Sequence, residues 1–177
     1  MSLKLMLEDA AKRYGGKTAI ILGEQRLSYT ELDAASNKVA NALTGIGVGK
    51  GDRVVMLLPN IPEFAVIYFG IVKTGAIAVP LDTRYKVDEL ASIFDNSQPQ
   101  VLVSESPFLE PLVPILPRFK SIKHVIDLSS RYEGQFLSYR EIMATGSAHR
   151  VKVEPEPEDI AHIAYTSEPT GHPKGVM

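Results

Sequence analysis

The sequence predicts an α/β fold in which helices cover both faces of a mostly parallel sheet. Short apolar runs of strand length alternate with stretches of helical periodicity along most of the chain. The runs at residues 54–58 and 76–81 are apolar without interruption, which is typical of strands buried on both faces. This alternation favours βαβ crossovers, and 177 residues are enough for one domain or a large part of one.

The first predicted elements are a helix, a hairpin and a second helix. Apolar residues at positions 3, 6, 7, 10 and 11 have helical spacing and predict a helix over Leu3–Tyr14, which Gly15-Gly16 ends. Residues 18–22 and 26–29 predict two strands that turn back at Gly23-Glu24. A stripe of apolar residues from 32 to 46 predicts the second helix, which starts either with a capping box of Ser28 and Glu31 or with Thr30 alone.

The rest of the chain alternates strand and helix up to an acidic, proline-rich stretch at 151–157, which we expect to be a surface connector. The predicted elements are strand 54–58, helix 62–74, strand 76–81, helix 86–96, strand 100–105, a short helix within 107–119, strand 123–128, a short helix at 138–144 and strand 160–165.

Composition and charge exclude several classes of protein. The net charge of −2 gives no basic face, so we expect no nucleic-acid partner. The chain has no cysteine, which excludes disulfides and thiolate metal sites and permits a reducing, cytoplasmic location, the compartment that we expect. The most apolar segment, Phe64–Val72, has nine residues against the ~20 that a bilayer span needs, so we expect a buried helix and no transmembrane segment.

Neither the histidines nor the acidic residues predict a metal site. The four histidines have no ligand spacing, and His162 alternates with apolar residues, which favours a satisfied interior or rim histidine over a catalytic base. The carboxylates at 154, 156, 158 and 159 are compatible with a metal site, but the prolines between them favour a solvated linker.

Residues 165–175, YTSEPTGHPKG, have the composition of a phosphate-binding loop. Such a loop needs hydroxyl and backbone N–H donors, glycines that let the backbone approach the ligand, and a cation. The candidates are Thr166, Ser167, Thr170, Gly171 and Lys174, and they follow a predicted strand, where α/β proteins bind ligands. The spacing is not that of the common P-loop, and on this stretch alone a simple turn is the favoured interpretation.

Several motifs, taken in order, resemble the start of the adenylate-forming (AMP-binding) superfamily, which includes acyl-CoA synthetases, peptide-synthetase adenylation domains and luciferases. The matching stretches are RLSYTELDAASNKVANALTGIGVGKGDRV, LLPNIPEFAVIYFGIVKTGAIAVPL and the loop at 165–175, which looks like the family signature YTSGTTGxPKGV. The resemblance covers the chain from about Leu3 to its end, and the order of the motifs is more specific than any one of them.

The resemblance implies an acyl-CoA synthetase that activates a small carboxylic acid with ATP and Mg²⁺ and transfers it to coenzyme A. The loop residues that match the family motif, Thr166, Ser167, Thr170, Gly171 and Lys174, would then contact the phosphates of ATP. Relatives are several hundred residues long. We therefore expect residues 1–177 to be the N-terminal (AMP-binding) subdomain of an acyl-CoA synthetase-like fold, with the rest of the large domain and the C-terminal domain absent. We expect this part to hold no catalytic residue and to be inactive alone.

The centre of the loop departs from the family pattern. Glu168 replaces glycine and puts a carboxylate where a polyphosphate would lie. Pro169 replaces a hydroxyl residue, removes an N–H and restricts Glu168 to an extended backbone. We therefore expect that the loop binds ATP weakly or not at all.

Three explanations for this departure stay open. The sequence could be engineered or in error, the protein could be a degenerate relative, or the loop could work differently with its missing half supplied. The alternative function is a non-catalytic binding or scaffold module, in which an open sheet edge could pair two copies into a homodimer.

Overall fold

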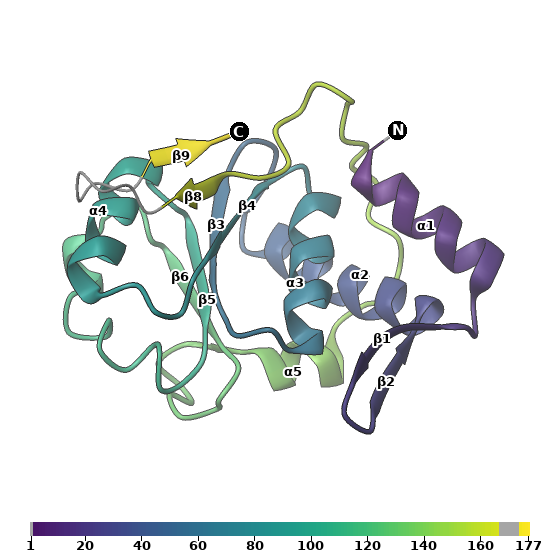
Figure 1. Ribbon diagram of the computed structural model, residues 1–177, viewed down its shortest axis with the longest axis horizontal. Coiled ribbons are helices and arrows are strands. Elements are labelled where there is room, and N and C mark those ends of the chain that lie inside the picture. The colour runs from purple at the N-terminus through teal and green to yellow at the C-terminus, as the bar shows by residue number, and fades with distance from the viewer. Residues whose placement is uncertain (1, 167–173) are drawn as a thin grey trace.

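The computed structural model describes residues 2–166 and 174–177, and these form a layered α/β unit (Figure 1). The helices are α1 (Leu3–Tyr14), α2 (Tyr29–Gly45), α3 (Pro62–Lys73), α4 (Val87–Ser97) and α5 (Tyr139–Thr145), with a 3-10 turn η1 (Leu116–Arg118). The strands are β1 (Thr18–Leu22), β2 (Gln25–Ser28), β3 (Arg53–Leu57), β4 (Ile77–Leu81), β5 (Val101–Ser104), β6 (His124–Asp127), β7 (Leu137–Ser138), β8 (Ala164–Thr166) and β9 (Lys174–Val176).

The main sheet has five parallel strands in the order β4-β3-β5-β6-β7. Strand β3 pairs with β4 on one side and β5 on the other, and its side chains are buried on both faces of the sheet, which explains why its sequence is apolar without alternation. The predicted parallel α/β sheet is therefore confirmed. Strands β1 and β2 form the predicted hairpin as a separate antiparallel pair.

Successive side chains of the central strands pack into two different hydrophobic cores, one on each face of the sheet. Val54 and Met56 of β3 face a cluster that α1, α2 and α3 cover, whereas Val55 and Leu57 face a cluster that α4 and the segment 108–122 cover. In Figure 1, α1 to α3 lie to the right of the sheet and α4 lies to its left. Helices cover both faces, as the sequence predicts, because each strand residue points opposite to its neighbours.

The start of α2 is a capping box. The backbone N–H of Glu31 donates to the Ser28 hydroxyl at 3.2 Å, and the Glu31 carboxylate accepts from the Ser28 N–H at 2.8 Å. Of the two starts that the sequence left open, this is the one that forms. The hydrogen bonds from Ser28 hold the pKa of Glu31 below its usual value.

Helices α2 and α3 pack closely because α3 carries a glycine at the contact. A Cβ atom built on Gly70 would lie 2.5 Å from Cγ1 of Val39 and 3.1 Å from the carbonyl oxygen of Ser36. Such distances are not tolerated between non-bonded atoms, so Gly70 lets the two helix backbones approach each other.

The apolar spacing of α1 does not predict its whole buried face, which also contains two polar residues. The helix forms over the predicted residues, but it buries Lys4 and Glu8 beside Leu7 and leaves Met6 exposed. The Lys4 ammonium donates to the backbone carbonyl of Val151 at 2.9 Å, which satisfies its charge inside the protein.

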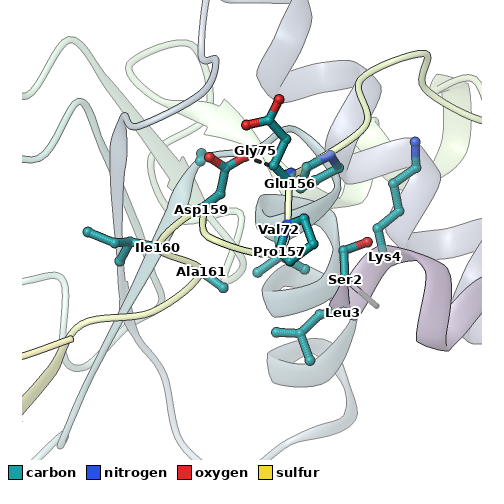
Figure 2. Close-up of a pocket in the computed structure, with 12 residues that line it drawn as sticks. Ser2, Leu3, Lys4, Val72, Gly75, Glu156, Pro157, Asp159, Ile160 and Ala161 are labelled. Atoms are coloured by element: carbon teal, nitrogen blue, oxygen red, sulfur yellow. Dashed lines mark hydrogen bonds between the residues drawn. The ribbon is translucent and has the colours of Figure 1, made fainter.

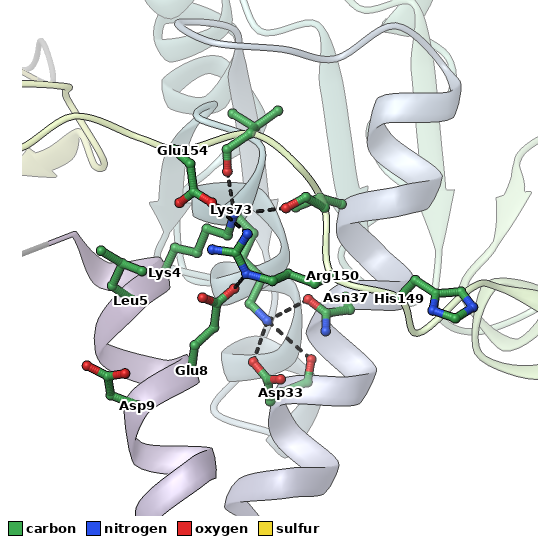
Figure 3. Close-up of polar contacts among 12 residues, drawn as sticks. Lys4, Leu5, Glu8, Asp9, Asp33, Asn37, Lys73, His149, Arg150 and Glu154 are labelled. Atoms are coloured by element: carbon green, nitrogen blue, oxygen red, sulfur yellow. Dashed lines mark hydrogen bonds and ion pairs between the residues drawn. The ribbon is translucent and has the colours of Figure 1, made fainter.

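The connector that follows α5 is tied to the N-terminal helices by ion pairs (Figure 3). Arg150 bridges Glu8 and Glu154 at 2.9 and 2.6 Å, and Glu154 also lies 3.4 Å from the Lys4 ammonium. Further on, Lys50 lies 2.8 Å from Asp159. The segment that was expected to be a solvated linker therefore forms ion pairs. These pairs hold the connector against α1 and Lys50 before the chain returns to the sheet.

The short helix predicted within the proline-broken stretch 107–119 forms as the 3-10 helix at 116–118. Two other points of the prediction need correction. Strand β7 is absent from the prediction, since it is two residues long and depends on β6 for its pairing. The strand expected at 160–165 is regular only from Ala164, and the isolated bridge of His162 to Ala78 precedes it.

The segment Phe64–Val72 lies within α3, whose residues Val66, Ile67 and Ile71 are core residues, so the prediction of a buried helix is confirmed. Within the described residues, none of the helices combines the length and the hydrophobicity that crossing a membrane requires.

Candidate functional site

The carboxyl ends of the parallel strands meet at one edge of the sheet, where α/β proteins bind ligands. Polar residues follow each strand there: Asn60 shortly after β3, Asp82 after β4, Glu105 after β5, and Asp127 as the last residue of β6. This edge is the candidate functional site.

The chain returns to this edge along the outer side of β4. The N–H of Ala78 donates to the carbonyl of Ala161, and the N–H of Ile163 donates back to Ala78, both at 2.9 Å. The bridge between Ala78 and His162 is parallel, so β8 runs toward the same edge as β4. His162 is half-buried, with its Nδ1 3.4 Å from the Tyr68 hydroxyl, as the rim interpretation expects.

Strands β8 and β9 form an antiparallel pair at this edge, and they bring two predicted site residues together. Thr166, the last residue of β8, lies directly opposite Lys174, the first residue of β9, and both are exposed. The other predicted contacts, Ser167, Thr170 and Gly171, lie outside the described residues, as do Glu168 and Pro169.

A pocket of 490 Å³ lies at the ends of β3 and β4. Its lining comes from residues 58–60, 64 and 80–84. Arg84 donates from Nε to both carboxylate oxygens of Asp82 at 3.1 Å, and this contact lowers the pKa of Asp82 to about 2. The pair leaves the Arg84 side chain largely exposed at the pocket rim, with its charge balanced by that of Asp82.

The opposite half of the edge is acidic. Burial, with the charges of Glu63 and Asp127, raises the pKa of Glu105. Asp127 is buried and accepts hydrogen bonds from the backbone of Arg131 and from Ser129, so it holds its own loop. Beyond β4 the Arg84 guanidinium and the Asp82 carboxylate balance each other, whereas Glu105 and Asp127 make the ends of β5 and β6 acidic.

Tyr165 is the residue that the motif contains but that sequence reasoning does not single out. Its hydroxyl donates to Asn96 of α4 at 2.5 Å, and its carbonyl accepts from the Tyr85 hydroxyl at 3.2 Å. These partners lie 69 and 80 residues away along the chain. No local sequence pattern could have indicated them.

A smaller pocket of 130 Å³ lies away from this edge (Figure 2). The start of α1, residues 72–76 and the segment 155–161 line it. Its charged groups are already paired, since Asp159 and Glu156 contact Lys50, and Lys4 contacts Glu154. It offers little to a ligand, and the candidate site remains at the carboxyl edge.

Comparison with known proteins gives consistent matches along the chain. A family model described as AMP-binding enzyme matches residues 7–177. A long-chain-fatty-acid–CoA ligase of Mycobacterium tuberculosis is 34% identical over 152 residues, which are 86% of this chain and 29% of the relative. A crotonobetaine/carnitine–CoA ligase of Salmonella typhimurium is 33% identical over 198 residues, covering 99% of this chain and 36% of the relative.

The solved structures agree with the sequence matches. The anthranilate–CoA ligase AuaEII, crystallised with anthranoyl-AMP, superposes with a TM-score of 0.94 at 28% identity, covering 99% of this chain and 34% of that chain. The chain thus spans about a third of the length of the relatives it matches. The resemblance found in the sequence is confirmed, and the chain belongs to the AMP-binding enzyme family, in which the relatives compared here are acid–CoA ligases.

Proposed function

We propose that this chain is the N-terminal subdomain of an ATP-dependent acid–CoA ligase and that the loop between β8 and β9 is its phosphate-binding element. The observation that carries the proposal is the pairing of Thr166 with Lys174 at the carboxyl edge of a parallel sheet. A hydroxyl and an ammonium face each other there across the neck of a loop whose sequence carries Ser167, Thr170 and Gly171. Family membership supports the same assignment.

The proposed reaction has two steps. A carboxylate oxygen of the acid attacks the α-phosphorus of ATP, the bond to the β-phosphate oxygen breaks, and pyrophosphate leaves. The thiol sulfur of coenzyme A then attacks the acyl carbon, AMP leaves with the electron pair of the acyl–oxygen bond, and the thiol proton is released. The loop residues would stabilise the charge on the departing pyrophosphate by donating hydrogen bonds and by placing the Lys174 ammonium nearby.

The distribution of charge along the edge supports this placement of the phosphates. Lys174 begins β9 beside β8, and the Arg84 guanidinium beyond β4 is balanced by Asp82, whereas Glu105 and Asp127 lie on the β5 and β6 side. A triphosphate is repelled by carboxylates, so the β5 and β6 side is the less favourable one for it.

The proposed magnesium ion would arrive bound to the nucleotide. Across residues 2–166 and 174–177, no group of three or more His, Asp or Glu side chains could hold a metal ion by itself. Magnesium commonly keeps several waters and binds through substrate phosphates, so it needs few protein ligands. An ion that arrives bound to ATP would add positive charge at the phosphates.

The substrate class that we propose is a carboxylic acid, with no size assigned. The names of the relatives include long-chain fatty acids, crotonobetaine and carnitine, and hydroxybenzoates, which share the carboxylate and little else. We further propose a cytoplasmic setting, which a chain without cysteine permits.

We also propose that residues 1–177 alone do not complete the reaction, because the matched relatives extend over about three times this length. The acyl pocket and the residues that act on the thioester step would then lie in those further regions. Acyl-adenylate formation by the 177-residue polypeptide, measured as pyrophosphate release, would contradict this part of the proposal.

The first prediction concerns ATP binding by the loop. We expect the sequence as it stands to bind ATP weakly, and we expect the double variant Glu168→Gly/Pro169→Thr to bind at least about tenfold more tightly. The variant removes a repelling carboxylate and restores an N–H and a hydroxyl, and a charge-assisted hydrogen bond is worth roughly 1.5–3 kcal/mol. Isothermal titration calorimetry with Mg-ATP measures the difference.

The matched control adds Lys174→Met to the double variant, and it should lose the gain. Micromolar affinity in the unmodified chain would refute the expectation of weak binding. Equal affinity with and without the Lys174 ammonium would refute the assignment of the site.

A further inference from the structure

We propose that Tyr85 and Asn96 are positioning residues for the β8–β9 pair, which they hold at a fixed orientation through Tyr165. This inference rests on the proposed function, because its purpose would be to aim Thr166 and Lys174 at the phosphates. Neither residue would touch the ligand.

The backbone attachment of the returning chain to the main sheet is short. Ala161 and Ile163 exchange hydrogen bonds with Ala78. From Ala164 onward the strand pairs with β9. A two-stranded pair of three residues each has little stability of its own, so contacts from side chains must fix its direction.

Tyr165 supplies such contacts at both of its ends. The Tyr85 hydroxyl donates to the Tyr165 carbonyl at 3.2 Å, and the Tyr165 hydroxyl donates to Oδ1 of Asn96 at 2.5 Å. Tyr85 lies just after β4, and Asn96 lies in the last turn of α4, so two separate elements hold one residue. Both hydroxyls are protonated at neutral pH and can donate, and burial raises the pKa of both tyrosines further.

The second strand of the pair depends on the same ring. Gly175 lies opposite Tyr165, and a Cβ atom built on Gly175 would lie 3.2 Å from Cζ of that ring and 3.0 Å from Cγ2 of Ile163. The glycine lets β9 lie close over the ring. The hydrogen bonds of Tyr165 therefore also fix the orientation of β9 at Gly175 and at its neighbour Lys174.

The two positioning residues, Tyr85 and Asn96, can be substituted without damage to the hydrophobic core. Asn96 is exposed, so its truncation leaves no cavity. Tyr85 is half-buried above a pocket of 120 Å³, and its change to phenylalanine removes the hydroxyl and keeps the ring. Asn96→Asp is the conservative variant, since a carboxylate can still accept the hydrogen bond from Tyr165.

The first experiment measures amide hydrogen exchange in β8 and β9 by NMR. Tyr85→Phe and Asn96→Ala should each accelerate exchange at residues 165, 166, 174 and 175 by about three- to tenfold, as expected for loss of one hydrogen bond. Asn96→Asp should keep exchange slow. Tyr132→Phe, which changes a tyrosine in the loop between β6 and β7, is the matched control and should have no effect.

The melting temperature should change by less than about 2 °C in these variants, because the pair opens locally below the free energy of global unfolding. Unchanged exchange in both Tyr85→Phe and Asn96→Ala would overturn the inference.

The second experiment measures Mg-ATP affinity in the Glu168→Gly/Pro169→Thr background. Tyr85→Phe and Asn96→Ala should raise the dissociation constant about three- to tenfold, and Asn96→Asp should keep it within about twofold. Faster exchange with unchanged affinity would overturn the positioning role. If the background variant does not bind ATP at all, the proposed function fails, and the exchange experiment still decides whether the anchors exist.

Discussion

At the scale of single residues, two lysine side chains without exposed surface join separate elements: Lys73 joins α3 to α2, and Lys4 joins α1 to the connector after α5 (Figure 3). The Lys73 ammonium donates to the carboxylate of Asp33 at 2.6 Å and to the amide oxygen of Asn37 at 2.7 Å. Burial lowers the pKa of Lys73, and the hydrogen bond that Lys73 donates to Asp33 opposes this shift. The charge is tolerated because it is paired.

The Lys73–Asp33 pair yields a prediction about stability. Asp33→Ala should destabilise the protein by about 3 kcal/mol, because it leaves a buried ammonium without its counter-ion. The double variant Asp33→Ala/Lys73→Met should recover most of that loss, since the cation is removed with its partner. Urea unfolding followed by circular dichroism measures both, and a double variant no more stable than Asp33→Ala would contradict the explanation.

At the scale of elements, the contact between α2 and α3 depends on a missing side chain. Gly70→Ala should destabilise the fold by about 1–3 kcal/mol, because the added methyl group overlaps Val39. Adding Val39→Ala should restore part of the loss by opening space.

The control is Gly45→Ala, which changes the last residue of α2, where a Cβ atom would meet no heavy atom within 4 Å. That variant should be neutral or slightly stabilising, since alanine favours helix. Thermal unfolding measures the series, and equal effects at Gly70 and Gly45 would show that crowding at the helix contact is not the cause.

Helices and strands could be predicted from the sequence where a local residue pattern determines their structure. The capping box before α2 and the apolar run of β3 carry their own signals, so their structures follow from sequence. Strand β7 and the shortened β8 carry no comparable signal, because their boundaries depend on which neighbour supplies hydrogen bonds.

At the scale of the whole molecule, four half-buried tyrosines set an alkaline limit on stability. Burial is the main cause that raises the pKa of Tyr68, Tyr85, Tyr139 and Tyr165. The folded chain keeps protons that the unfolded chain releases above about pH 10, so this contribution to stability is complete below pH 10 and is lost as the pH rises further. Lys73 has the opposite sign, because the folded chain releases its proton first.

The prediction is that the free energy of unfolding falls as the pH rises from about 10 to 11.5, with Tyr139 contributing at most about 1.4 kcal/mol per pH unit. Tyr139→Phe removes one titrating phenol and should make the fall shallower. Urea unfolding at a series of pH values, with tyrosinate absorbance followed in parallel, measures this. The same slope in Tyr139→Phe and the unmodified chain would contradict the assignment.

Across the molecule, sequence predicts the layers and the position of the candidate loop, but not what holds that loop. Thr166 and Lys174 could be predicted from the sequence because they belong to a short motif. Tyr85 and Asn96 could not be predicted, since their contacts to Tyr165 span 80 and 69 residues and form only once the sheet has formed. The burial of Lys4 was hidden for the same reason, because its acceptors are backbone carbonyls about 150 residues away.

The separation of charge along the strand tips has a kinetic consequence. A polyanion that diffuses toward the molecule is repelled by Glu105 and Asp127 outside β5 and β6, whereas outside β4 the charges of Arg84 and Asp82 balance, so encounters are biased away from the acidic side before any specific contact forms. Dissolved salt screens such fields over about 8 Å at physiological ionic strength, so added salt weakens this bias.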